Sequence, residues 1–300
     1  MKSKKSFVLA LAAFAALAVS ASSGSAAGPD WGAVATALGK PGTDMNGVYR
    51  VGLPRSDLHA TLDGVVLKPT LALDSWLAFA AMGEKTMVMG DLVLTEDEVG
   101  PVMKKLEQGG IDITALHNHL FRASPATFYM HVYAEGDAVT LAKALHDALV
   151  LSKTPLTTAP APATPPKIDL DTAAIDGALG GKGKIAGGVY QVGIPRSAPV
   201  IEHGMTIPAA MGSAEAINFQ PTGKGSAAIT GDFVLIASEV NPVLRALREN
   251  GIEVTALHNH MLDDEPRLFF MHFWANAPLP KLLTGLRAAL SHVAVQAPPK

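Results

Sequence analysis

The chain contains no cysteine among its 300 residues. This absence excludes disulfides, a cysteine nucleophile, thiolate metal ligands and lipid attachment through an N-terminal cysteine. Charged residues are scarce at 17%, and the formal net charge is −3 with no evident basic patch. Nucleic-acid binding therefore has little electrostatic support. The hydrophobic fraction of 48% is instead typical of a globular protein stabilised by ordinary burial or by bound ligands.

A long membrane-spanning run is also missing. Lys2, Lys4 and Lys5 precede a short apolar run, Phe7–Ala21, and small residues follow it up to Ala27. This pattern predicts a cleaved signal peptide over residues 1–27, and the run is too short for a membrane anchor. Without the three lysines the formal charge of −3 becomes −6. We expect a periplasmic or secreted protein without a stable membrane anchor.

The chain is internally duplicated, with a constant offset of 141 residues. Residues 90–119 and 231–260 align without a gap and are identical at 17 of 30 positions. Both segments end in the string TALHNH. The stretch 152–167 is rich in Pro, Ala and Thr, which is typical of a semi-rigid linker. We therefore predict a first repeat at 30–151, a linker at 152–167 and a second repeat at 168–293.

Each repeat has the pattern of strands, a helix, two strands and a final helix. VYRVGLP (48–54) and VYQVGIP (189–195) alternate and are bounded by Gly and Pro, as strands are. Hairpins are predicted around 83–85 and 222–225, and Thr95 with Glu98 indicates a capped helix start. The predicted fold is α+β: a tandem duplication of a mainly antiparallel sheet with two packed helices per copy.

The two TALHNH strings predict histidine clusters. In a strand, His117 and His119 point to the same face. If the next strand pairs antiparallel through a turn centred near Pro125, His119 lies opposite His131 and His117 opposite Tyr133. Each copy would then group three imidazoles: His117, His119 and His131 in the first, and His258, His260 and His272 in the second. The other four histidines have no counterpart at the 141-residue offset.

Three neutral imidazoles suit a divalent metal, with Zn²⁺ as the first candidate and Cu²⁺ or Fe²⁺ as alternatives. Two other interpretations stay open at this point. The histidines could line a pocket for an organic ligand together with aromatic residues, namely Tyr129, Tyr133, Phe270 and Trp274. They could also have only a structural role on a polar sheet face.

Two arginines and two aspartates complete the candidate site. Arg55 and Arg196 end matched strands and could clamp a carboxylate or phosphate, or else bind carbonyl oxygens at the strand end. Asp91 and Asp232 follow a glycine within a strand. Each could be a fourth metal ligand or a general base, or could pair with one of the arginines.

Both copies resemble the DUF1259 family of exported bacterial proteins, also called LppY/LpqO. The resemblance rests on VMGDLVLTEDEVGPVMKKLEQGGIDITALHNHL (88–120) and on the matching segment of the second copy, PTGKGSAAITGDFVLIASEVNPVLRALRENGIEVTALHNHM (221–261). It implies an exported protein of uncharacterised function and supplies no reaction. This sequence departs from the lipoprotein members because it has no cysteine.

These observations predict a two-repeat exported protein that binds a divalent metal and, with it, a small anionic ligand or a hydrolysable substrate. A competing hypothesis is a non-catalytic small-molecule binding module without metal. A third is an interaction protein of the cell envelope that presents two equivalent surfaces. The sequence leaves open whether the two copies form separate sites or one, and what the oligomeric state is.

Overall fold

The computed structural model describes residues 28–157 and 167–296. The predicted signal peptide and residues 158–166 of the predicted linker lie outside the described residues. Within the part that is described, no helix is long and apolar enough to cross a membrane.

The first copy forms a six-stranded sheet in the order β1-β2-β5-β6-β8-β7, and every neighbouring pair is antiparallel. Its strands are β1 (Thr43–Asp44), β2 (Val48–Pro54), β5 (Asp74–Met82), β6 (Lys85–Leu94), β7 (Asp112–Asn118) and β8 (Phe128–Gly136). Its helices are α1 (Trp31–Leu38), α2 (Pro69–Ala72), α3 (Glu96–Gln108) and α4 (Ala138–Leu149), and β3 (Thr61–Leu62) pairs with β4 (Val65–Val66) in a small hairpin.

The second copy repeats this arrangement in the order β9-β10-β13-β14-β16-β15. Its strands are β9 (Lys184–Ala186), β10 (Val189–Pro195), β13 (Ala214–Gly223), β14 (Ser226–Ile236), β15 (Glu253–His258) and β16 (Leu268–Pro278). Its helices are α5 (Thr172–Leu179), α6 (Ala237–Glu249) and α7 (Leu279–Leu290), with a 3₁₀ turn η1 (Ala209–Met211) and a small hairpin of β11 (Ile201–Glu202) and β12 (Met205–Thr206).

Local sequence explains the ends of these elements. Asp30 accepts the backbone N–H groups of Gly32 and Ala33 at 2.9 and 3.0 Å and so begins α1. Glu98 accepts the N–H of Thr95 at 2.9 Å at the start of α3, as the capping pattern predicts. Gly83 turns the β5–β6 hairpin with a φ of 61°, a conformation that glycine adopts at little cost. The predicted hairpins and helices are therefore present.

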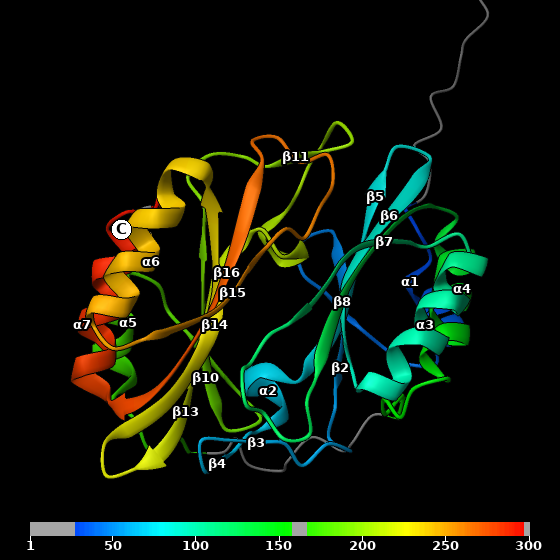
Figure 1. Ribbon diagram of the computed structural model, residues 1–300. Coiled ribbons are helices and arrows are strands. Elements are labelled where there is room, and N and C mark those ends of the chain that lie inside the picture. The colour runs from blue at the N-terminus through cyan, green and yellow to red at the C-terminus, as the bar shows by residue number, and fades with distance from the viewer. Residues whose placement is uncertain (1–27, 158–166, 297–300) are drawn as a thin grey trace, which may run out of the picture.

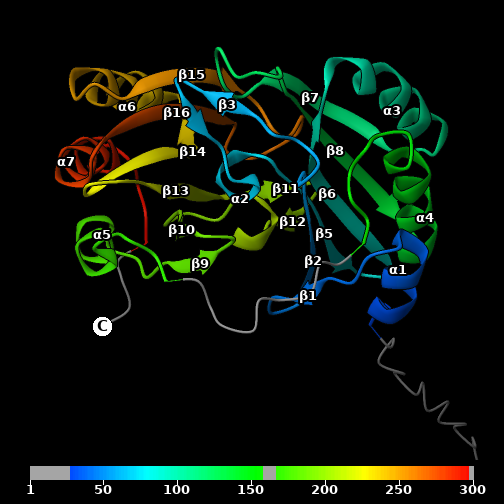
Figure 2. The same ribbon diagram turned by 90° about the horizontal axis from the view of Figure 1, so that it is seen from below.

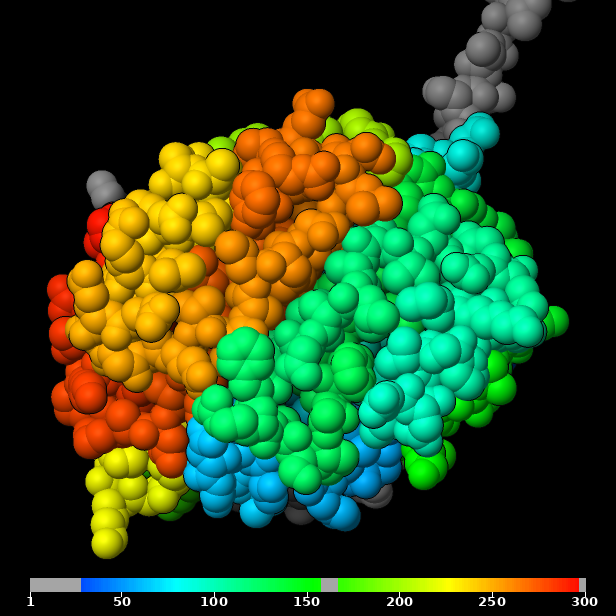
Figure 3. Space-filling model, viewed as in Figure 1, coloured from blue at the N-terminus to red at the C-terminus, as the bar shows by residue number. Residues whose placement is uncertain are grey.

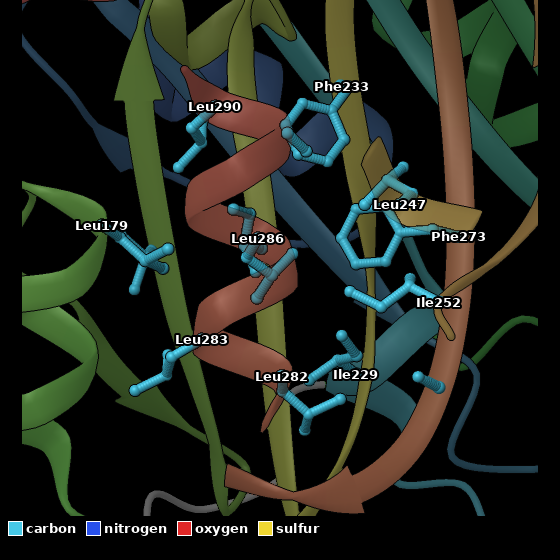
Figure 4. Packing of buried hydrophobic residues seen from close by; sticks show 14 of the residues in the cluster. Leu179, Ile229, Phe233, Leu247, Ile252, Phe273, Leu282, Leu283, Leu286 and Leu290 are labelled. Carbon is cyan, nitrogen blue, oxygen red and sulfur yellow. The ribbon is translucent and has the colours of Figure 1, made fainter. Parts of the chain in front are cut away.

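The two copies stack as four layers. Helices α1, α3 and α4 cover the outer face of the first sheet, and α5, α6 and α7 cover that of the second (Figures 1 and 2). In the second copy Leu286 and Leu247 of the helices meet Phe233 and Phe273 of the sheet, and all four side chains are fully buried (Figure 4). Burying a side chain of this size contributes about 1.5–3 kcal/mol. The predicted α+β tandem duplication is confirmed, with three helices instead of two packed on each sheet.

The inner faces of the two sheets face each other. Met87 and Met89 of β6 share an apolar cluster with Val234 of β14 and Phe270 of β16. Helix α2 reaches across to the second copy, where Asn218 and Thr230 donate hydrogen bonds to the Leu71 carbonyl at 3.2 and 2.8 Å. Figure 3 shows the copies meeting along a continuous seam. The repeats therefore share a buried interface, and this interface is where the candidate site lies.

Candidate metal centre between the two repeats

Strand pairing sets the positions of the histidines, and it differs from the predicted register. In the structure His117 lies opposite Tyr129 and His131 opposite Ala115, so the predicted pairs His119–His131 and His117–Tyr133 are wrong. The pairing is centred two residues earlier, and Ser124 bonds to Thr61 of β3 instead of closing a tight turn near Pro125. A bulge in β7 between Ile113 and Ala115 changes the register only beyond the histidines. The shift is even, so the three histidines still share the inner face.

The six duplicated histidines meet in one cluster between the sheets. His117 and His258, which are equivalent in the two copies, stack with ring centroids 3.5 Å apart. On either side of this pair the rings of His119 and His272 lie 3.5 Å apart, and those of His131 and His260 lie 3.8 Å apart. The 141-residue offset converts the His119–His272 contact into the His260–His131 contact, so the two are equivalent. The duplication therefore builds one shared centre with approximate twofold symmetry.

Asp91 and Asp232 supply a carboxyl group at each end of this cluster. Asp91 pairs directly with His131 across β6 and β8, and Asp232 pairs with His272 in the same way. The Asp232 carboxylate lies 3.4 Å from His260 Nε2 and 3.5 Å from His272 Nδ1, and Asp91 lies 3.9 Å from His131 Nε2. Both aspartates follow glycines that the strand packing requires: a Cβ on Gly231 would lie 2.0 Å from the Ala216 carbonyl.

Many nitrogen and oxygen atoms of this cluster that could bind a metal ion have no hydrogen-bond partner among the described residues. They are Nδ1 of His117 and His119, Nε2 of His131, His258 and His260, and Oδ1 of Asp91 and Asp232. Three groups each bring ligand atoms within 4.8 Å of one another: His117–His258–His272, His131–His258–His260 and Asp232–His260–His272. Buried polar atoms are normally paired, so a convergent set without partners indicates a site for a cation.

The electrostatics of the cluster suit a cation as well. Burial lowers the pKa of all six histidines, to about 3 for His119 and to about 4 for His258. The rings are therefore neutral at physiological pH, which is the form that binds metal ions. Burial also raises the pKa of Asp91 to about 8 and that of Asp232 well above its usual range. A bound cation would stabilise both as carboxylates.

Comparison with known proteins identifies the repeats. The family described as "Domain of Unknown Function (DUF1259)" matches residues 32–151 and 173–292. The protein belongs to the DUF1259 family. No curated protein matches the chain.

Two solved structures show weak similarity to this DUF1259 protein. One is the trimeric bacterial microcompartment shell protein PduB, at 9% identity with a TM-score of 0.21, covering 84% of this chain and 89% of that one. The other is EtuB from Clostridium kluyveri, at 8% identity with a TM-score of 0.19, covering 86% of this chain and 97% of that one. Neither similarity supports a conclusion about function.

A cavity of about 320 Å³ adjoins the histidine cluster. Asp91, Asp232, His119, His260 and His272 line its inner end. Both copies contribute its walls, from β2 and β5 on one side and β10 and β13 on the other. A small molecule in this cavity would lie against the histidines and carboxyl groups.

The structure places Arg55 and Arg196 away from this cavity. Arg55 is fully buried and donates to Glu98 at 2.8 and 3.1 Å and to the Val93 carbonyl at 2.6 Å. Arg196 makes the same contacts with Glu239, at 2.8 and 3.1 Å, and with Val234. Neither arginine lines the cavity, and neither lies against Asp91 or Asp232. Their guanidinium groups join the end of a strand to the start of a helix in each DUF1259 repeat.

The aromatic residues divide between the cluster and its surroundings. Tyr129 packs edge-on against His119 at a centroid distance of 4.1 Å, and Phe270, its equivalent, stacks on His260 at 3.4 Å. Tyr133 instead stacks on His203, and Trp274 donates its indole N–H to Asp63. Tyr129 and Phe270 thus hold ring orientations within the cluster, while Tyr133 and Trp274 serve the interface around it.

The cavity also contains residues that the sequence did not single out. Arg50 lies over the Trp76 ring at 4.1 Å and donates from Nη1 to the Ala210 carbonyl at 2.5 Å. Burial lowers the pKa of Arg50 to about 10, so it stays charged at neutral pH. Arg50 and Asp74 both line the cavity. Strand alternation gave a signal, since Arg50 stands between buried Tyr49 and Val51 and must point to the opposite, inner face.

Proposed function

We propose that this protein binds a divalent transition metal at the centre formed by the six histidines and two aspartates. The observation that carries the proposal is the convergence of ligand atoms within 4.8 Å, from three residues at a time, in a cluster where five histidine nitrogens are buried without a hydrogen-bond partner in the described chain. Imidazole and carboxylate ligands suit Zn²⁺, with Cu²⁺ and Fe²⁺ as alternatives.

The surroundings of the ligands support this assignment. His258 Nδ1 lies 2.9 Å from the Asn259 carbonyl, and a proton on that nitrogen leaves the lone pair on Nε2. His272 Nδ1 lies 3.0 Å from the Gly231 carbonyl in a similar arrangement. Outer hydrogen bonds of this kind orient metal-binding histidines and fix their tautomer.

The adjoining cavity supports a role in binding a small anionic ligand. Three histidines leave coordination positions open, and a metal there can bind an anion or activate a water molecule for hydrolysis. Arg50 faces the same cavity and takes the part that the sequence had suggested for Arg55 and Arg196. A carboxylate or phosphate between the metal and Arg50 would be contacted by two positive groups.

Elemental analysis of protein purified without a histidine tag tests the metal proposal. We expect at least one equivalent of a transition metal in the wild type and less in His117→Ala and His258→Ala. The matched control is His59→Ala, since His59 is an exposed histidine outside the cluster. Traces of metal that are equal in all four proteins would refute the proposal.

The cavity also supports a second candidate function, the binding of an organic ligand without metal. Its walls include Trp76 and Tyr129, which offer apolar surface beside Arg50. Thermal-shift screening of small carboxylates and phosphate esters separates the two functions. Stabilisation that persists in EDTA favours the metal-free module, and stabilisation that EDTA abolishes favours the metal centre.

We further infer export to the periplasm or the medium from residues 1–27. Cell fractionation with N-terminal sequencing of the mature protein tests this inference. A cytoplasmic protein that retains Met1 would refute it.

A further inference from the structure

We propose that the centre holds two metal ions, each bound by the two TALHNH histidines of one repeat and by the third histidine of the other repeat. This inference rests on the proposed metal-binding function and specifies its stoichiometry and its ligands. One set is His258, His260 and His131. The other is His117, His119 and His272.

The first set is a complete ligand group. One nitrogen from each of His131, His258 and His260 lies within 4.8 Å of the others. Nε2 of each of these three residues is buried and has no hydrogen-bond partner in the described chain. His131 comes from β8 of the first repeat, while His258 ends β15 of the second and His260 follows it.

The second set is the image of the first when the two repeats are exchanged. An offset of 141 residues converts His258, His260 and His131 into His117, His119 and His272. His272 contacts the two other members through different ring nitrogens: its Nε2 lies 3.3 Å from His117 Nε2, and its Nδ1 lies 2.5 Å from His119 Nε2, so a ring must rotate before one ion can be bound by all three. The two sets have no residue in common, so both can be occupied at once.

The contacts favour pairing between repeats over pairing within a repeat. Across the interface the His119–His272 and His131–His260 ring centroids lie 3.5 and 3.8 Å apart. Within a repeat the equivalent centroids lie farther apart, at 5.2 Å for His117–His131 and 4.7 Å for His258–His272. The β7–β8 register places Tyr129, and not His131, opposite His117. A single metal ion with three histidine ligands would leave the other three imidazoles of this buried cluster without a metal ion to bind.

Charge balance indicates the class of ligand. Two carboxylates lie beside the sets: Asp91 is 3.9 Å from His131 of the first set, and Asp232 lies between the sets, 3.4 Å from His260 and 3.5 Å from His272. Two divalent ions with two carboxylates leave a net positive charge next to a cavity that Arg50 also lines. Paired metal ions characteristically bind both sides of one oxyanion. The dinuclear centre would therefore take a small oxyanion, a carboxylate or a phosphate, in this cavity.

Double variants test the pairing directly, with zinc content per folded chain as the measurement. We expect two zinc ions in the wild type and in His59→Ala. Replacing His131 and His260, which share a set across the repeats, should leave one ion. Replacing His131 and His119, which belong to different sets of the same repeat, should leave none. Pairing within each repeat predicts the reverse, one ion for His131/His119 and none for His131/His260, and that result would overturn the inference.

The wild-type protein alone decides the stoichiometry, even if a variant fails to fold. Copper-loaded protein should show a spin-coupled pair by electron paramagnetic resonance. One uncoupled copper per chain would overturn the dinuclear inference and leave the metal-binding function standing. No bound metal under any loading condition would refute both.

Discussion

Replacing Glu98 by alanine tests whether the arginine that both repeats carry at the end of a matched strand is structural. The Glu98 carboxylate accepts hydrogen bonds from Arg55 at 2.8 and 3.1 Å, and from the backbone N–H groups of Thr95 and Lys153 at 2.9 and 2.8 Å. Arg55 is 0% exposed. Removing one partner of a buried pair leaves an uncompensated charge and costs about 3–5 kcal/mol. Because Asp57 still contacts Arg55, at 2.8 Å, we expect a loss of about 3 kcal/mol.

Urea unfolding at pH 7, followed by circular dichroism, measures this loss. Glu239→Ala removes the equivalent carboxylate beside Arg196 and should give at least as large a loss, because Ala198 stands at the position equivalent to Asp57. The control is Asp147→Ala, since Asp147 and Lys105 form an exposed pair 3.7 Å apart that contributes less than about 1 kcal/mol. Arg55→Met combined with Glu98→Ala should cost less than the sum of the single changes, because no buried unpaired charge then remains.

A loss below about 1 kcal/mol for Glu98→Ala would contradict the structural role argued for Arg55. An Arg55→Met protein that has unchanged stability and binds small anions less tightly would also contradict this structural role. That result would show that Arg55 binds the ligand. Metal content per folded chain should be unchanged in Glu98→Ala, because Glu98 contacts none of the histidines.

Three further predictions follow from the cavity and its walls. Burial raises the pKa of Asp74 from 3.8 to about 6, so the folded protein loses stability as the pH rises from about 4 to about 6. Asp74→Asn should therefore raise the unfolding free energy by about 2–3 kcal/mol at pH 8 and leave it unchanged at pH 3. An equal effect at both pH values would contradict this assignment. Arg50→Gln introduces the residue found at the equivalent position of the second repeat, Gln191. It should weaken the binding of phosphate or a carboxylate to the metal-loaded protein by about 10- to 100-fold, because a charged hydrogen bond contributes about 1.5–3 kcal/mol. Calorimetry measures this affinity. Unchanged affinity would remove Arg50 from the ligand site. Gly231→Ala places a Cβ 2.0 Å from the Ala216 carbonyl, so it should destabilise the protein by about 1–3 kcal/mol and lower its metal content. The control is Gly100→Ala, whose Cβ meets nothing within 4 Å and should change neither property. Equal stability of the two variants by thermal unfolding would refute the close approach.

The sequence alone determined the repeat and its elements. The 141-residue offset, the hairpin around Gly83 and the start of α3 at Thr95 all follow from local patterns that the structure confirms. Alternation along β7 and β8 also placed His117 and His131 on one face, because side chains in a strand alternate with a period of two. These features depend on neighbours in sequence, which a single chain displays directly.

Only the tertiary structure decided how the histidines combine. The register between β7 and β8 is set where the connecting loop bridges from Ser124 to Thr61, a contact that has no periodic signal in the sequence. The contacts of His119 with His272, and of His131 with His260, depend on how the inner faces of the two sheets pack. Sheet packing sums many weak contacts between residues that are distant in sequence. For this reason TALHNH and the histidine of the following strand predicted three histidines in each repeat, whereas the packing of the repeats brings all six into one centre.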